Sequence, residues 1–149
     1  MRTLLALCFR HSYPLIRFYW RMFGKHVIEV RCLIIHDGRV LLIRHSYGPE
    51  GWSLPGGGAR RNESPVAAIS REVKEEVGIS LPSVDQIEVN RVQPTPIPVK
   101  SLCFVAEVDS ADFKLNGAEV AEARWFGLCD LPPNLLPEAS AALALYGQQ

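Results

Sequence analysis

Hydrophobic and polar residues follow two different periods along the chain, and the changes of period predict its secondary structure. A run rich in β-branched residues, Val27–His36, and a second apolar run at residues 40–43 predict two strands. Asp37-Gly38 between them is a dipeptide typical of tight hairpin turns. Over Pro65–Val77, apolar residues spaced three and four apart predict a helix instead.

Residues suited to helix ends bound this helix. Ser64 is a good N-cap, Pro65 fits the first helical position, and Gly78 predicts the C-terminal stop. An apolar stripe that we expect to pack on a sheet is formed by Val66, Ile69, Val73 and Val77. The acidic residues occupy a different face, which we expect to point away from that sheet.

Short strands and two more helices are predicted for the rest of the chain. Strand patterns cover residues 52–54, 87–92, 101–108 and 123–126, with turns at 56–58 and 116–117, an irregular loop at 93–98 and a break at 131–133. Helical patterns cover residues 14–23 and Pro137–Tyr146. Strands mixed with a few helices on one small core predict an α/β sandwich.

Composition and charge favour one folded domain with an unusual N-terminal segment. The chain has 149 residues, of which 48% are hydrophobic, and a formal net charge of zero, which excludes a disordered chain. Residues 1–26 contain five basic residues and no acid, so they form a basic extension on an acidic body. We therefore divide the chain into this extension and a domain at residues 27–149.

The cysteines and the N-terminal segment bear on location and partners. No CxxC pair is present, which argues against a zinc site and suits a reducing cytoplasm; the cysteines are Cys8, Cys32, Cys103 and Cys129. The apolar run at residues 3–9 is too short to span a membrane. The basic amphipathic helix at 14–23 can lie on an anionic membrane, but its aromatic residues favour packing on its own domain or on a second subunit, as in a homodimer.

Three glutamates in the central helix form the main chemical feature. Glu72, Glu75 and Glu76 stand at i, i+3 and i+4, so their carboxylates share one face. Such a cluster suits Mg²⁺, which prefers hard oxygen ligands and bridges carboxylates to phosphates. The alternative is a solvated charged face with Arg71 and Lys74 interleaved. The glycines directly before the helix favour the metal site.

A more specific pattern contains these glutamates. Gly57, Glu63, the triplet at 71–73, the pair at 75–76 and the pair at 78–79 fill every defined position of G-x5-E-x7-R-E-U-x-E-E-x-G-U, where U is aliphatic. This pattern is the Nudix box, and the chain resembles the MutT-like Nudix hydrolases over about residues 27–146. The resemblance implies a Nudix-type α/β/α sandwich with a mixed central sheet. Asn62 departs mildly from the family pattern, because a glycine is common there, and can adopt a left-handed backbone.

The resemblance also assigns roles to residues. Metal ligands would be the carbonyl of Gly56 and the carboxylates of Glu72, Glu75, Glu76 and Glu119. The acid of the later loop would contact the metal or act as the catalytic base, with Glu119 the first choice and Glu122 the second; Glu76 or Glu72 could be the base instead. Glu63 and Arg71 would form an ion pair that positions the acids. The cofactor would be Mg²⁺, for which Mn²⁺ can substitute.

The expected reaction is hydrolysis of a diphosphate bond in a nucleoside diphosphate linked to another group, such as a nucleoside triphosphate, ADP-ribose or a nucleotide sugar. Arg44 would bind phosphate and Trp52 would stack on a base, although a surface arginine and a core tryptophan are equally consistent; His45 and Tyr47 lie in the same loop. We expect a small nucleotide-like substrate, no stable nucleic-acid partner and no membrane association. The alternative is a Nudix-fold nucleotide-binding or regulatory module without catalysis.

Overall fold

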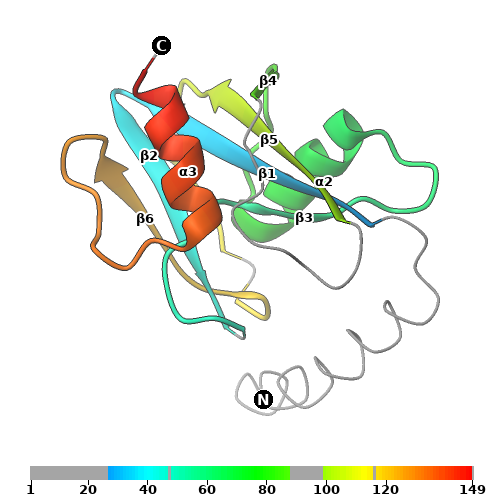
Figure 1. Ribbon diagram of the computed structural model, residues 1–149, viewed down its shortest axis with the longest axis horizontal. Coiled ribbons are helices and arrows are strands. Elements are labelled where there is room, and N and C mark those ends of the chain that lie inside the picture. The colour runs from blue at the N-terminus through cyan, green and yellow to red at the C-terminus, as the bar shows by residue number, and fades with distance from the viewer. Residues whose placement is uncertain (1–26, 47, 88–98, 116, 149) are drawn as a thin grey trace.

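The computed structural model describes residues 27–46, 48–87, 99–115 and 117–148 (Figure 1). The predicted helix at 14–23, the loop at 93–98, Tyr47 and most of the predicted strand at 87–92 lie outside these residues. In the described part of the chain, no helix is long and apolar enough to span a membrane.

Eight elements follow one another in the described residues. They are β1 (Val27–His36), β2 (Arg39–His45), β3 (Gly56–Gly58), α2 (Pro65–Val77), β4 (Asp85–Ile87), β5 (Val99–Glu107), β6 (Val120–Gly127) and α3 (Pro137–Tyr146). The predicted bounds of β1, α2 and α3 are confirmed. The strands β2, β4, β5 and β6 differ from their predicted ranges by one to three residues at the ends that the structure describes.

The strands form one mixed sheet between two helices. Its order is β4-β5-β1-β2-β6, with β3 paired to β1 beside this path. The long pairing of β1 with β5 is parallel, whereas the other pairings are antiparallel. Helix α3 covers one face of the sheet and α2 lies behind the other (Figure 1). The predicted α/β/α sandwich with a mixed sheet is confirmed.

Alternate residues of β1 build the two core layers. Val30, Cys32 and Ile34 are fully buried against α2, whereas Leu33 and Ile35 are buried on the face that α3 covers. This alternation is the period-two pattern of a strand buried on both faces. Strand β1 therefore contributes to both core layers and positions the strands that pair with it, β2, β3 and β5.

Helix α2 begins and ends as the sequence predicts. The Ser64 hydroxyl accepts a hydrogen bond from the Ala67 N–H at 3.2 Å, and Gly78 ends the helix with a φ of 72°. The predicted apolar stripe is wrong at one position: Val66 is 50% exposed, and the buried stripe begins at Ala68. Val66 lies in the first turn, before the helix reaches the core.

The glycines at residues 56–58 form a strand and not the predicted turn. They pair antiparallel with residues 29–31 of β1. At Gly56, where φ is 143°, an added Cβ would lie 2.1 Å from the Val30 carbonyl oxygen. Only glycine allows this close approach of two backbones. The predicted strand at 52–54 is reduced to isolated bridges, Ile43 to Ser53 and Trp52 to Leu135.

Candidate active site

Among the described residues, the most buried acidic side chain lies against the glycine strand β3. The Gly56 N–H donates a hydrogen bond to Glu76 Oε2 at 2.8 Å, and Glu76 is only 3% exposed. The expectation that the acidic face of α2 points away from the sheet is therefore wrong for Glu76. The reason is that Glu76 lies beside Val73 and Val77 on the helix, and β3 has no side chains to keep it out.

A second glutamate of α2 also lies against this strand. A Cβ added at Gly57 would lie 2.7 Å from Glu72 Cδ and 2.8 Å from its Oε2. Real Cβ atoms do not approach other heavy atoms so closely, so the Glu72 carboxylate occupies the space that a side chain at residue 57 would need. The absence of side chains in β3 thus places two carboxylates of α2 next to its backbone.

Arg71 joins the loop before α2 to the acids of the helix. Its guanidinium donates to both carboxylate oxygens of Glu63, at 2.8 and 2.9 Å, and to the Gly58 carbonyl at 3.0 Å. It also donates to Glu72 at 2.7 Å and, more weakly, to Glu75 at 3.4 Å. The geometry contains the ion pair between Glu63 and Arg71 that the sequence predicts. Bidentate arginine–carboxylate pairs of this kind are rigid as well as strong.

The pKa of Glu63 reflects this pairing. Hydrogen bonds from the Arg71 side chain, followed by the backbone N–H of Arg60, lower the pKa of Glu63 to about 2. Asn62, directly before it, adopts the left-handed backbone that the sequence analysis allowed, with a φ of 64°. The loop is therefore held in place by charge and by backbone geometry together.

The Glu63 pairing predicts a pH dependence of stability. Because the folded-state pKa is lowered, Glu63 stabilises the fold fully above its unfolded pKa of about 4.5 and loses this contribution as the pH falls towards 2. We expect Glu63→Gln to lower the free energy of unfolding at pH 6, and this difference from the wild type to shrink at pH 3. Urea titrations at the two pH values measure it, with the exposed Glu50→Gln as the matched control. A difference that is equal at both pH values would contradict the ion pair.

Glu75 is the outermost of the three helix acids. Its side chain is 45% exposed and pairs with Arg60 at 3.1 Å. Among the described residues, no three His, Cys, Asp or Glu side chains converge as a cation site in this geometry. Glu72 and Glu75 instead hydrogen-bond to arginines, so a cation would have to compete with Arg71 for them.

The charges of the acids nevertheless act on one another. Burial raises the pKa of Glu76 to about 8; the Gly56 N–H and the charge of Arg31 oppose this rise, and Glu72 and Glu119 add to it. Burial also raises the pKa of Glu119, and the charges of Glu72 and Glu75 add to that rise. A cluster of carboxylates that repel one another in a partly desolvated place fits a hard divalent cation.

The structure separates the two candidate acids of the later segment. Glu119 lies in the turn directly before β6, close enough to the helix acids to be affected by their charges. Its backbone carbonyl accepts a hydrogen bond from the Ser46 N–H at 2.9 Å, which ties the turn to the end of β2. Glu122, in contrast, pairs with Arg44 at 3.3 Å and Arg124 at 2.9 Å. This geometry favours Glu119.

The two residues expected to contact substrate lie together on the face of the sheet that α3 covers. Trp52 is 6% exposed and packs edge to face on Phe126, with ring centroids 4.8 Å apart. The guanidinium carbons of Arg44 and Arg124 lie 5.7 and 5.9 Å from the Trp52 ring. Stacking of a base on Trp52 would therefore require these arginines to move, and both substrate roles stay predictions.

Two residues near the acids were missed or passed over in the sequence analysis. His45 Nδ1 lies 3.9 Å from Glu76 Oε1, and burial and then the charge of Arg31 lower the pKa of His45, while the hydrogen bond that its ring donates to the backbone carbonyl of Glu119 opposes this. Arg31 is the second. The signal that points to it is a charged residue in the middle of an apolar strand, between the fully buried Val30 and Cys32.

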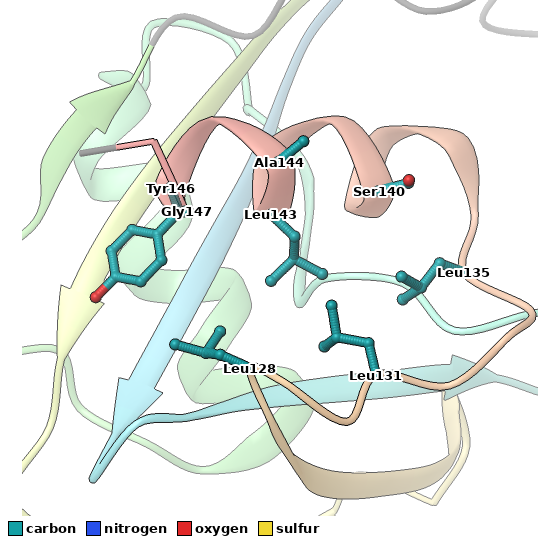
Figure 2. Close-up of a pocket in the computed structure, with 8 residues that line it drawn as sticks. All are labelled: Leu128, Leu131, Leu135, Ser140, Leu143, Ala144, Tyr146 and Gly147. Carbon is teal, nitrogen blue, oxygen red and sulfur yellow. The ribbon is translucent and has the colours of Figure 1, made fainter.

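A separate pocket lies under α3 (Figure 2). The leucine side chains of its wall point toward one another below the helix, and Tyr146 lies at one end. It is lined by Leu128, Leu131, Leu135, Ser140, Leu143, Ala144, Tyr146 and Gly147. None of these residues carries a charge, so this pocket is unsuited to a diphosphate.

Comparisons with known proteins agree with the geometry of the acidic helix. The NUDIX domain model matches residues 25–146. The chain belongs to this family, and the prediction of a Nudix pyrophosphohydrolase is confirmed at the level of the family. The match begins close to the predicted domain boundary at residue 27, and the role of residues 1–26 stays a prediction.

Individual relatives give the range of proteins that the chain is similar to. It is 35% identical over 122 residues to the NAD-capped RNA hydrolase NudC of Deinococcus radiodurans, covering 74% of this chain and 42% of that protein. It is 31% identical over 141 residues to NudC of Escherichia coli (strain K12 / DH10B), covering 87% and 52%. The chain thus spans about half the length of these relatives.

For two solved structures, the match to this chain extends over nearly the whole of the solved chain. The MutT NUDIX hydrolase from Burkholderia pseudomallei is 28% identical with a TM-score of 0.72, covering 81% of this chain and 98% of that one. An ADP-ribose pyrophosphatase from Streptococcus suis 89-1591 is 26% identical with a TM-score of 0.60, covering 83% and 92%.

Proposed function

We propose that this chain hydrolyses a phosphoanhydride bond in a nucleoside diphosphate linked to another group, with a divalent cation as cofactor. The observation that carries the proposal is the buried Glu76 carboxylate, held by the Gly56 N–H within reach of the charges of Glu72 and Glu119. A buried carboxylate is costly without a partner of opposite charge. A cation and the phosphates that come with it supply such a partner.

The residues present fit Mg²⁺, or Mn²⁺ in its place. Glu72 and Glu76, with the carbonyl of Gly56, would hold the cation, Glu75 would join from the exposed side, and Glu119 would stay free for proton transfer. When bound, the cation neutralises phosphate charge and lowers the pKa of coordinated water. Arg71 is a positioning residue, because it fixes Glu72 through a 2.7 Å hydrogen bond while it remains bound to Glu63.

The chemistry requires a proton acceptor. Water attacks one phosphorus, a new P–O bond forms, the bond from that phosphorus to the bridging oxygen breaks, and two phosphate monoesters leave. The proton of the attacking water goes to a carboxylate. We assign this task to Glu119, since it is half-buried with a raised pKa and therefore a better base than an exposed acid.

The assignment to Glu119 predicts a specific loss. We expect Glu119→Gln to lower kcat by about 10²-fold, because the variant keeps its size but cannot accept a proton. The measurement is steady-state hydrolysis at saturating Mg²⁺. Glu122→Gln is the matched control, since Glu122 is bound to arginines, and we expect it to retain most activity. The opposite order of the two variants would move the role to Glu122.

The relatives guide the choice of substrate. Similarity to NudC proteins supports a substrate in which a diphosphate joins two nucleoside-like groups, as in NAD, ahead of a nucleoside triphosphate. The ADP-ribose pyrophosphatase neighbour supports ADP-ribose as a second choice. Both compounds contain the same adenosine diphosphate, so the acidic site can serve either one.

A substrate panel tests the proposal. The full chain is incubated with NAD, ADP-ribose, UDP-glucose, dGTP and an NAD-capped RNA, with Mg²⁺, Mn²⁺ or EDTA, and the products are identified by mass. We expect cation-dependent release of AMP from NAD or ADP-ribose. Tight binding of these compounds without any hydrolysis would instead favour the alternative, a nucleotide-binding module without catalysis. Cleavage of dGTP alone would overturn the substrate class.

A further inference from the structure

Arg31 places a positive charge in the middle of the central sheet. In β1 it pairs with Gly56 of β3 on one side and with Cys103 of β5 on the other. Its neighbours in sequence, Val30 and Cys32, are fully buried. A charged side chain at such a position costs desolvation free energy, so it is expected there only when it binds a partner of opposite charge.

The guanidinium of Arg31 has no carboxylate partner in the part of the chain that the structure describes. No acidic oxygen of these residues lies within 4.0 Å of it, and its hydrogen bond goes to the Val30 carbonyl at 3.3 Å. The other arginines near the acids are already engaged: Arg44 and Arg124 with Glu122, Arg60 with Glu75, and Arg71 with Glu63. Among the described residues, Arg31 is therefore the partly buried arginine near the acids that has no carboxylate partner.

Arg31 also lies next to the acids. Its partner in the ladder, Gly56, is the residue whose N–H holds Glu76 at 2.8 Å. The alternation of β1 places Arg31 with Leu33 on the opposite face of the sheet from α2. The charge of Arg31 is close enough to lower the pKa of both Glu76 and His45. The site thus has an acidic side for a cation and a basic side for an anion.

We infer that Arg31 binds the phosphate oxygens of the substrate diphosphate, across β3 from the acids that hold the cation. A planar guanidinium donates two parallel hydrogen bonds to a phosphate, and a diphosphate has enough oxygens for the cation and the arginine together. This inference rests on the proposed function, because it takes the diphosphate from it. It makes Arg31 the residue that selects for phosphate, with Arg44 left to the Glu122 pair.

A purely structural role for Arg31 makes a different prediction. If the guanidinium only offset the charge of Glu76, its removal would alter the binding of the cation. Phosphate would then be bound by the cation and not by Arg31, so its own binding would not depend on the guanidinium. If it binds phosphate, its removal weakens the binding of a diphosphate and leaves the binding of a cation by itself unweakened. Measuring the two ligands separately distinguishes these roles.

The test uses the full chain and a diphosphate that cannot be cut. Calorimetry measures the affinity for α,β-methylene-ADP with Mg²⁺, and electron paramagnetic resonance measures Mn²⁺ alone. We expect Arg31→Met to weaken the analogue by about 10- to 100-fold and Arg31→Lys to weaken it less, because lysine keeps the charge without the planar fork. Mn²⁺ binding stays as tight as in the wild type.

Arg39→Met is the matched control. Arg39 is also partly buried and has no carboxylate partner among the described residues. It lies near the hairpin, however, with its guanidinium carbon 6.0 Å from the centroid of the Trp125 ring. We expect this variant to bind the analogue as the wild type does. Equal losses in the Arg31 and Arg39 variants, or none in Arg31→Met, would overturn the inference.

Two arrangements keep the test decisive. If Arg31→Met does not fold, the Nε–H NMR signal of Arg31, assigned with Arg31→Lys, must move when the analogue is added to the wild type and must not move with adenosine; a signal that stays overturns the inference. Analogue binding does not need turnover. If the chain binds the analogue through Arg31 but cleaves no substrate, only the proposed function is refuted. If the Arg31→Met variant cleaves substrate as well as the wild type does, only this inference is refuted.

Discussion

Replacing Glu76 with glutamine is expected to lower kcat by about 10³-fold or more while the fold is kept. Glutamine has nearly the same volume, and its carbonyl oxygen can accept the Gly56 hydrogen bond that Glu76 accepts at 2.8 Å. It cannot supply a negative charge to a cation. Because Glu76 is the most enclosed of the helix acids, solvent cannot replace its contribution.

The measurement has a structural and a catalytic part. Circular dichroism and thermal unfolding check that the variant is folded, and initial rates at saturating Mg²⁺ give kcat. Glu75→Gln is the comparison, since Glu75 is half exposed and we expect a smaller loss from it. Turnover by Glu76→Gln close to that of the wild type would remove Glu76 from the site.

The second large effect concerns the glycine strand and separates folding from catalysis. At Gly56 an alanine Cβ would lie 2.1 Å from the Val30 carbonyl oxygen, at a φ of 143° that alanine rarely adopts. We expect Gly56→Ala to destabilise the fold by roughly 3 kcal/mol or more, from backbone strain and overpacking together. This cost corresponds to a fall of about 10 °C in the melting temperature.

The neighbouring glycines are expected to behave differently. At Gly57 the added Cβ would meet the Glu72 carboxylate and not backbone, so we expect Gly57→Ala to stay folded but to lose activity on the order of 10²-fold. At Gly58 nothing lies within 4 Å of the added Cβ, and Gly58→Ala is the control that keeps both properties. Thermal unfolding and initial rates are measured for all three. Equal losses at all three positions would contradict the geometry of β3.

The parts of the fold that local signals control were predictable from the sequence. Helix α2 has a Ser64 cap, a helical apolar period and Gly78 at its end, and these act within a few residues of one another. The pairing of Glu63 with Arg71 was also predictable, but only because the spacing matches a known family pattern. In both cases the structure contains what the pattern implies.

The parts that depend on distant contacts were not predictable. Three glycines in a row signal a turn, and their pairing with residues 29–31 of β1 is a tertiary contact that leaves no periodic pattern. The burial of Glu76 follows from that pairing, since it is the bare glycine backbone that admits the carboxylate. Arg31 was missed for the same reason, because only the pairing of β1 with β3 places it beside the acids.

The hydrogen bond from Gly56 to Glu76 makes one backbone amide an internal reporter of the site. Strand β3 is attached to β1 through its ladder, and to α2 through this N–H and through the hydrogen bond from Arg71 to the Gly58 carbonyl. Exchange of that hydrogen for deuterium requires the helix and the strand to separate, so its rate measures how often the two come apart. A ligand that tightens the junction slows this exchange even when no bond is cut, which makes occupancy visible in a chain that has been made catalytically silent.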